Sequence, residues 1–253
     1  MAQHRIARTV AAFALLVLPH TTVAAADDLT VLCSNGLQAV LTDLTPKFES
    51  TTHNKLTVTY GLAASLGQRI KGGEPFDVAF LTPAVVDYLV AAGKIARDTR
   101  TIVARSGLAL AIKTGSKKPD VGTSDAFTRA LLNAKGIAYA KEGASGVLFA
   151  ALIQRLGIAG DLQSKSRLTS SGEDVSQAVL KGDVEFGVLP LSEILPVKGE
   201  EPIVFPADVQ QYIVMVGGVN AASRNAGAAR ELIKYVTSPA ALPVLKAKGM
   251  EPR

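Results

Sequence analysis

Residues 76–92 read FDVAFLTPAVVDYLVAA, and this stretch decides the fold. Its first six residues form a largely apolar run of strand length, which predicts a buried strand. Thr82 is a favourable helix N-cap and Pro83 suits the first helical turn, so a helix is predicted from there to Ala92. A buried strand followed directly by a helix is the repeating unit of α/β architecture with a mainly parallel sheet.

The same alternation of short apolar runs and amphipathic stretches extends in both directions. Pro46 is expected to bend or shorten the first helix. Further strands are predicted at 29–33, 55–60, 107–113, 136–140, 184–189, 203–205 and 212–219, and further helices at 37–48, 65–71, 124–134, 146–156, 173–180, 226–237 and 239–248. The predicted fold class is therefore α/β, with mainly parallel sheets flanked by helices.

The order of these elements predicts two lobes. A polar stretch at 114–119 follows the long apolar strand and suggests a change of lobe nearby. The last two helices have no strand after them, so we expect them to pack on the first lobe, which makes that lobe discontinuous. The predicted boundaries are 27–106 plus 220–253 for the first lobe and 107–219 for the second.

The first 26 residues have the order of a secretory signal peptide. Arg5 and Arg8 precede an apolar run over 10–18, and Pro19 and the small residues 23–26 follow it. The run is shorter than the roughly 20 residues that span a bilayer. Removal of residues 1–26 takes away two arginines and no acidic residue, so the formal net charge falls from +5 to +3. We expect a soluble periplasmic protein.

The residue inventory argues against several classes of function. No basic cluster extends beyond Lys117 and Lys118 and there is no Trp, so no nucleic-acid partner is expected. The single cysteine, Cys33, is interpreted as a buried structural thiol. His53 lies in a polar stretch and is interpreted as a solvated side chain, so neither a catalytic triad nor a His/Cys metal site is available within residues 27–253. We expect no cofactor, no metal and no enzyme activity.

Small turns containing Gly and Ser recur before helices in both halves of the chain. They lie at 34–36, 61–65, 143–146 and 170–174. The start of a helix presents unpaired backbone N–H groups and the positive end of the helix dipole, and small residues let a ligand approach closely. Several such starts facing one crevice would hold a small anion.

The chain resembles the periplasmic molybdate-binding proteins of ABC transporters over essentially all of residues 29–253. The residues that carry the resemblance are at 65–70, 73–81, 87–88, 91–95, 172–175, 178–179, 187–189 and 248–250. The resemblance implies a two-lobe type II periplasmic-binding fold with a hinge, a small anionic ligand held between the lobes, and delivery to a membrane permease. We expect the protein to be a monomer.

The resemblance also implies where ligand contacts fall. The expected contact region in the first lobe comprises Ser34, Asn35, Gly36, Ala63, Ala64 and Ser65, and that in the second comprises Ser145, Gly146, Val175 and Pro190. Gly36 and Ala63 stand where the family has serines, and Pro190 stands where it has a tyrosine. Each lost hydroxyl removes a hydrogen bond worth roughly 1.5 to 3 kcal/mol to a charged ligand. We therefore expect either an altered oxyanion mode or an organic carboxylate.

Two other classes of function stay open at this point. The protein could be a sensor or accessory binder of a small organic carboxylate. Closure of its two lobes on the ligand would then signal to a membrane partner, without transport. An enzyme on this architecture is the third class, because a fold does not fix a function. Glu142 and Glu173 are the acidic candidates that the sequence offers for it.

Overall fold

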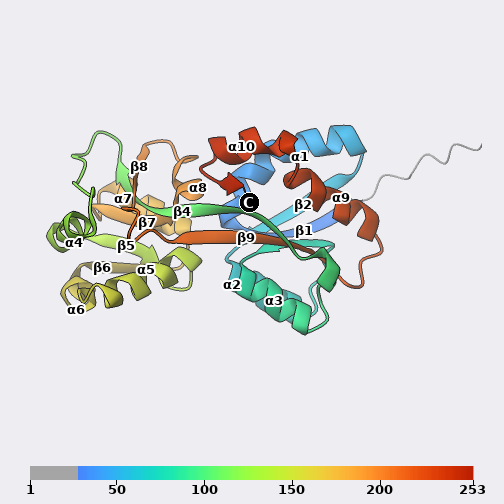
Figure 1. Ribbon diagram of the computed structural model, residues 1–253, viewed down its shortest axis with the longest axis horizontal. Coiled ribbons are helices and arrows are strands. Elements are labelled where there is room, and N and C mark those ends of the chain that lie inside the picture. Colours follow the sequence, from blue (N-terminus) through green and yellow to red (C-terminus); the bar gives the residue numbers. More distant parts are fainter. Residues whose placement is uncertain (1–27, 253) are drawn as a thin grey trace, which may run out of the picture.

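The computed structural model describes residues 28–252, so the predicted signal peptide at 1–26 lies outside the described residues. The chain folds into two α/β lobes, which lie side by side along the long axis of the molecule (Figure 1). No helix within residues 28–252 has both the length and the apolar character that a membrane crossing requires.

The first lobe has a mixed sheet with helices on both faces. Its strands are β1 (Asp28–Ser34), β2 (Lys55–Gly61), β3 (Val78–Leu81), β9 (Tyr212–Val219), the first half of β4 (Thr101–Lys113) and the short β10 (Glu251–Pro252). β1 pairs in parallel with β2 and β3, and β9 pairs antiparallel with β3 and β4. Its helical elements are η1 (Asn35–Leu37), α1 (Gln38–Thr52), α2 (Ala63–Lys71), α3 (Pro83–Ala91), η2 (Arg97–Thr99), α9 (Ala226–Val236), η4 (Pro239–Ala241) and α10 (Leu242–Ala247).

Two apolar layers hold the first lobe together. In Figure 1, α1, α9 and α10 lie above its sheet, whereas α2 and α3 lie below it. Phe48 of α1 and Leu232 of α9 are fully buried in the upper layer, and Leu66 and Leu89 fill the lower one. The segment that decides the fold therefore supplies the central strand β3 and one of the two lower helices.

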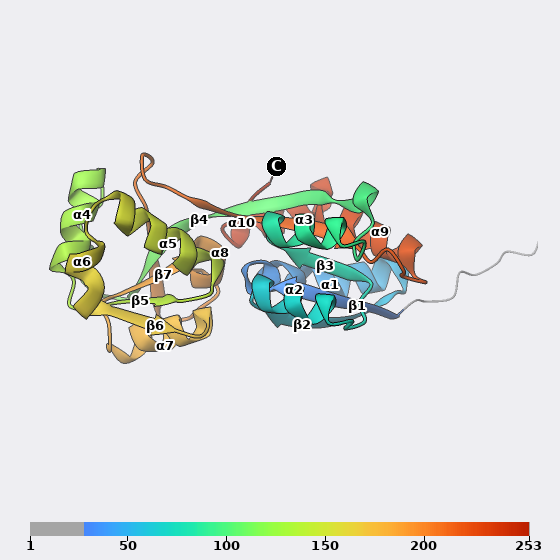
Figure 2. The ribbon, with the colours of Figure 1, turned by 90° about the horizontal axis from the view of Figure 1, so that it is seen from below.

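The second lobe is built in the same way around a smaller sheet. Its strands are the second half of β4 with β5 (Ile137–Ala140), β6 (Ser166–Thr169), β7 (Phe186–Pro190) and β8 (Glu200–Val204). α4 (Ser124–Asn133), α5 (Ala144–Arg155) and α6 (Ala159–Leu162) lie on one side of the sheet, and α7 (Gly172–Lys181) on the other (Figure 2). η3 (Gln163–Lys165) connects α6 to β6. The short α8 (Leu191–Ile194) follows β7 directly. β5 pairs in parallel with β6 and β7, and the antiparallel pairs involve β4.

Two long strands connect the lobes. β4 pairs with β9 from Thr101 to Gly107 and then with β7 and β8 of the second lobe. Where the paired residues of β4 and β9 end, the Leu108 amide still donates to the Gln211 carbonyl at 2.9 Å. The side-chain amide of Gln210 adds to this bond: its Oε1 accepts from the Leu108 amide at 2.9 Å and its Nε2 donates to the Leu108 carbonyl at 3.1 Å. We call this crossing, residues 106–108 with 210–212, the hinge.

A buried serine at the hinge links the two lobes. The Ser106 hydroxyl donates to the carbonyl of Gly249 at 3.0 Å and accepts from the amide of Ser192 at 3.0 Å. Gly249 belongs to the C-terminal segment on the first lobe, and Ser192 lies in α8 of the second. The orientation of α8 is thereby fixed to the hinge.

The predicted α/β fold is confirmed, but the sheets are mixed and not mainly parallel: among the described strands four pairs are parallel and five are antiparallel, because β4 and β9 run against their neighbours. Local details differ as well. α1 does not stop near Pro46 but continues to Thr52, and His53 ends it with φ +63°. β4 begins at Thr101, six residues earlier than predicted, and α6, β6 and α8 were not predicted at all. The lobe boundaries stay a proposal; because β9 pairs with β3 over Val78–Leu81, we place 212–219 with the first lobe.

Candidate functional site

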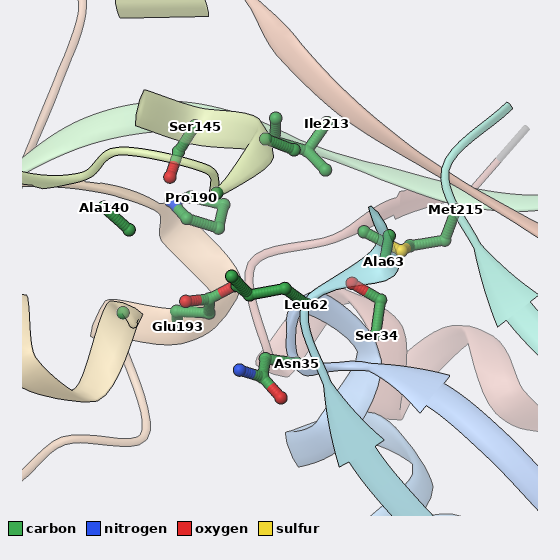
Figure 3. A pocket seen from close by; sticks show the side chains of 13 residues that line it. Ser34, Asn35, Leu62, Ala63, Ala140, Ser145, Pro190, Glu193, Ile213 and Met215 are labelled. Atoms are coloured by element: carbon green, nitrogen blue, oxygen red, sulfur yellow. The ribbon is translucent and has the colours of Figure 1, made fainter. Parts of the chain in front are cut away.

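Two adjoining cavities lie between the lobes. The inner cavity is lined from the first lobe by Ser34, Asn35, Leu62, Ala63, Ile213 and Met215, and from the second by Ala140, Gly143, Ala144, Ser145, Gly172, Pro190 and Glu193. Figure 3 shows side chains of the two lobes facing each other across it. The outer cavity shares Asn35, Gly172 and Glu193 with the inner one and has a volume of ≈ 800 Å³. A ligand in these cavities would touch both lobes.

Helix starts from both lobes reach the inner cavity. α2 begins at Ala63 after Leu62, and α5 begins at Ala144 after Gly143; neither has a side-chain cap. By contrast, the Ser171 hydroxyl caps α7 by accepting from the Asp174 amide at 3.1 Å. The first amides of a helix have no partner within the helix, so α2 and α5 present theirs to a ligand with the positive end of the dipole behind them.

Two serine hydroxyls and one amide complete the polar lining. Ser34 is 8% exposed and Ser145 is 7% exposed, and both line the inner cavity. Ser34 is the last residue of β1, and Asn35 begins the η1 turn that leads into α1. Since the two serines lie on opposite lobes, a single anion between them could accept a hydrogen bond from each.

Glu193 is the one charged side chain of the inner-cavity lining. It projects from α8, a single turn between Pro190 and Pro196, and Figure 3 shows its carboxyl group among the lining side chains. No hydrogen bond or ion pair to it is found among the described residues. Burial raises the pKa of the Glu193 carboxyl to about 7, because no neighbouring charge offsets the lost hydration.

Glycines on both lobes leave room for this carboxyl group. A Cβ at Gly172 would collide with Glu193 Oε2, and a Cβ at Gly36 would lie 3.8 Å from Glu193 Oε1. Gly172 starts α7 in the second lobe, whereas Gly36 lies in η1 of the first. The Glu193 carboxyl therefore lies between a glycine of the first lobe and a glycine of the second.

The outer cavity adds polar groups and a cation. Gln38, Thr42 and Tyr60 line it from the first lobe, together with Lys248. Lys248 Nζ is 2.9 Å from Asp43 Oδ2, so its charge is shared with that carboxylate. Burial raises the pKa of the Tyr60 hydroxyl, which keeps this side chain a neutral hydrogen-bond donor. The outer cavity is large enough for an organic ligand with several polar groups.

The structure brings together half of the predicted contact residues. Ser34, Asn35, Ala63, Ser145 and Pro190 line the inner cavity. The other predicted contacts lie outside both linings: Gly36, Ala64, Ser65, Gly146 and Val175.

The surroundings of these five residues explain why they do not line a cavity. Ala64 and Ser65 are exposed on the outer side of α2, and the Val175 amide already donates to the Ser171 carbonyl at 3.3 Å. Gly146 packs against the backbone of Ala140, and Gly36 packs against Met215. A ligand-binding role for these five residues stays a prediction.

Cys33 and His53, which the sequence also singled out, lie outside both cavity linings. Cys33 is fully buried, as predicted, and its thiol donates to the Ser34 carbonyl at 3.3 Å. His53 is exposed at the end of α1. Among residues 28–252 no group of three or more His, Cys, Asp or Glu side chains could hold a metal ion.

The structure places the two acidic candidates for catalysis differently. Glu142 is exposed and outside both cavity linings, and Glu173 lines the outer cavity with an exposed side chain. Sequence reasoning missed Glu193, although a carboxylate within the apolar segment PLSEILP at 190–196 was a signal for it. Glu200 is a second carboxyl whose pKa burial raises to about 7; it accepts from Ser176 at 3.2 Å and lies outside both linings.

Comparison with known proteins gives matches that cover most of the chain. Residues 29–251 match the family model described as bacterial extracellular solute-binding protein. An aconitate isomerase of Pseudomonas sp is 31% identical over 253 residues, which cover 95% of each chain. The periplasmic molybdate-binding protein of Azotobacter vinelandii has a TM-score of 0.77 at 18% identity, covering 89% of this chain and 99% of its own. The sulfate-binding protein SubI of Mycobacterium tuberculosis H37Rv has a TM-score of 0.75 at 17% identity, covering 89% and 87%.

Proposed function

This chain belongs to the bacterial extracellular solute-binding proteins, and from that premise we propose that it captures a small organic anion between its lobes for an ABC transporter. In this proposal residues 1–26 direct export to the periplasm and are then removed. The mature monomer delivers its ligand to a membrane permease. No nucleic acid, metal or cofactor takes part.

The observation that carries the proposal is the convergence of both lobes on one cavity. The uncapped starts of α2 and α5 and the hydroxyls of Ser34 and Ser145 come from opposite sides of the hinge. A ligand that contacts both lobes only when they are closed shifts the population toward the closed form by its difference in affinity for the two forms. Capture then needs affinity and a docking surface, but no nucleophile.

The cavity chemistry favours an organic carboxylate over a tetrahedral oxyanion. Ala63 and Pro190 line the inner cavity without offering a hydroxyl, and Glu193 adds a carboxyl group. The adjoining ≈ 800 Å³ exceeds the needs of a four-oxygen anion and adds Gln38, Thr42 and Lys248 as further polar partners. One carboxylate at the helix starts and a second toward Lys248 would use both cavities.

Calorimetric titration decides between the ligand classes. The mature protein is titrated with molybdate, tungstate, sulfate, phosphate and a panel of di- and tricarboxylates, and small-angle scattering is recorded with each. We expect binding by one or more carboxylates, accompanied by a more compact scattering profile. No heat from any anion, together with an unchanged profile, would refute the proposed function.

Replacing Ser34 or Ser145 by alanine should weaken binding of the carboxylate found in that panel. Each change removes one hydrogen bond to a charged group, which is worth about 1.5 to 3 kcal/mol, or about ten- to hundredfold in affinity. Ser65→Ala is the matched control, since Ser65 is exposed on α2 outside both cavities. Equal affinities for all three variants would show that the ligand binds elsewhere.

A second candidate function is isomerisation of an unsaturated tricarboxylate such as aconitate. The relative of that name suggests it, and Glu193 is the specific observation in its favour. A carboxyl group with a pKa of about 7 is present in both protonation states near neutral pH, as proton transfer in both directions requires. Glu193 would take a proton from the methylene carbon and return it to the far carbon of the three-carbon allylic unit, which moves the double bond without a cofactor.

Proton NMR of cis-aconitate incubated with the protein tests this candidate. If it holds, the wild-type protein converts cis- to trans-aconitate, and Glu193→Gln slows conversion by about 10²- to 10⁴-fold. Glu142→Gln, with an exposed side chain outside both cavities, should convert at the wild-type rate. Absence of conversion by the wild-type protein would leave ligand capture as the function.

The sensor or accessory alternative shares the same site and differs only in the partner. Genes for a permease and an ATPase beside the gene for this chain would favour transport.

A further inference from the structure

The geometry points to a shared proton between Glu193 and a carboxylate of the bound ligand, so that capture of the ligand takes up one proton from solvent. This inference rests on the proposed function, because it requires an organic anion in the inner cavity. It names what selects that anion and predicts how its affinity depends on pH.

The position of Glu193 places its carboxyl group beside the proposed ligand site. Its carboxyl group lies between Gly172 at the start of α7 and Gly36 in η1, so it faces the same space as Ser34 and Ser145. An anion held at the starts of α2 and α5 would share this cavity with it. Among the described residues no donor or cation already occupies the Glu193 carboxyl, and its hydrogen-bonding capacity is free for a ligand.

The other charged groups nearby do not neutralise Glu193. α8 packs against η1, β4, β7 and β8, and neither η1 nor β7 has a titratable side chain. Among the charged and titratable groups of β4, β8, the start of α7 and the outer cavity, none forms an ion pair or hydrogen bond with Glu193. These groups are Arg105, Lys113, Glu200, Glu201, Glu173, Asp174, Asp43, Tyr60 and Lys248.

Two carboxyl groups close together in a partly buried site resist ionising together, because their like charges repel where little water screens them. One proton between them converts this repulsion into a hydrogen bond from the protonated Glu193 to the ligand carboxylate. The raised pKa of Glu193, about 7, agrees with this arrangement, since the empty cavity already favours the neutral form. An anionic ligand raises that pKa further.

The sign of the pH dependence follows. Well below pH 7 Glu193 is already protonated, so binding takes up almost no proton from solvent and the affinity is nearly constant. Above pH 7 each binding event must draw a proton from solvent, so affinity falls about tenfold per pH unit. With a pKa of about 7 in the free protein, the affinity at pH 9 is about fiftyfold lower than at pH 7.

Calorimetry of the unmodified mature protein tests the inference. L-malate and propane-1,2,3-tricarboxylate serve as probes because both are fully ionised between pH 7 and pH 9. Titration at each pH in HEPES and in Tris, which differ in ionisation enthalpy, gives the number of protons taken up. We expect about one half at pH 7 and close to one at pH 8.5.

Glu193→Gln provides the matched variant. Its side chain cannot ionise but still donates a hydrogen bond, so its affinity should be independent of pH and should exceed that of the wild type at pH 9 by up to a hundredfold. Glu142→Gln should keep the wild-type pH slope. Binding of either probe without proton uptake would overturn this inference alone. If neither probe binds at pH 6 or at pH 8.5, the inference is overturned, whereas the proposed function fails only if no anion of the wider panel binds.

Discussion

Replacing Ala63 by aspartate is expected to lower the affinity for an organic anion about a thousandfold. Ala63 is the first residue of α2 and lines the inner cavity, so the new carboxylate would face the ligand. Two like charges about 4 Å apart in a protein with an effective dielectric constant of about 20 repel by about 4 kcal/mol, which is about a factor of a thousand. The measurement is calorimetric titration with the carboxylate that binds the wild type, at a pH near 7.

Ala64→Asp is the matched control. Ala64 is adjacent in the same helical turn but exposed and outside both cavities, so its charge would be screened by water. An acidic residue is favourable in the first turn of a helix, so neither variant should unfold α2. Circular dichroism checks this. Equal loss of affinity in both variants, or in neither, would contradict the assignment of α2 to the ligand site.

Gly146→Ala should destabilise the second lobe by about 3 kcal/mol, in the range for severe overpacking. A Cβ at Gly146 would collide with the carbonyl oxygen of Ala140 and would lie 3.3 Å from the ring of Tyr139. The first contact is with backbone, so α5 must move away from β5 as a unit. Thermal unfolding should show a midpoint lower by about 10 °C. Because Ser145 directly precedes Gly146, its hydroxyl would shift together with α5, so ligand affinity should fall as well.

The control for this prediction is Gly227→Ala in α9. A Cβ there has no atom within 4 Å and the residue is exposed, so alanine should stabilise the helix by up to about 1 kcal/mol. If Gly146→Ala unfolded at the temperature of the wild type, the close packing of α5 on β5 would be wrong.

Much of the fold could be predicted because the spacing of apolar residues along the sequence indicates which side chains are buried. Val78–Leu81 are buried because they form strand β3 at the centre of its sheet, and the apolar composition of this run indicates that directly. The elements that were missed are short or exposed: β6 at Ser166–Thr169 has no buried residue, and α6 and α8 have four residues each. Such elements exist through tertiary packing, which leaves little periodic signal. Pro46 was misleading because it lies inside α1 without ending it.

The candidate site could be predicted only in part, for a related reason. Helix starts with small residues are visible in the sequence, and those of α2 and α5 meet at the inner cavity. Which member of each turn faces inward depends on the helix rotation, so Ala63 lines the cavity whereas Ser65 points to solvent. Glu193 could not be predicted as a cavity residue, because the space around its carboxyl group is left by Gly36 and Gly172, which are remote from it in sequence.

In the proposed division of the chain, the second lobe is an insertion into the first. Gly107 and Tyr212 are cross-strand neighbours, so the chain enters and exits the second lobe side by side. At this crossing the main-chain bond from the Leu108 amide to the Gln211 carbonyl is reinforced by the side-chain amide of Gln210. Because Asp28 and Pro252 both lie in strands of the first lobe, a movement of the second lobe about this crossing would leave both described chain ends in place.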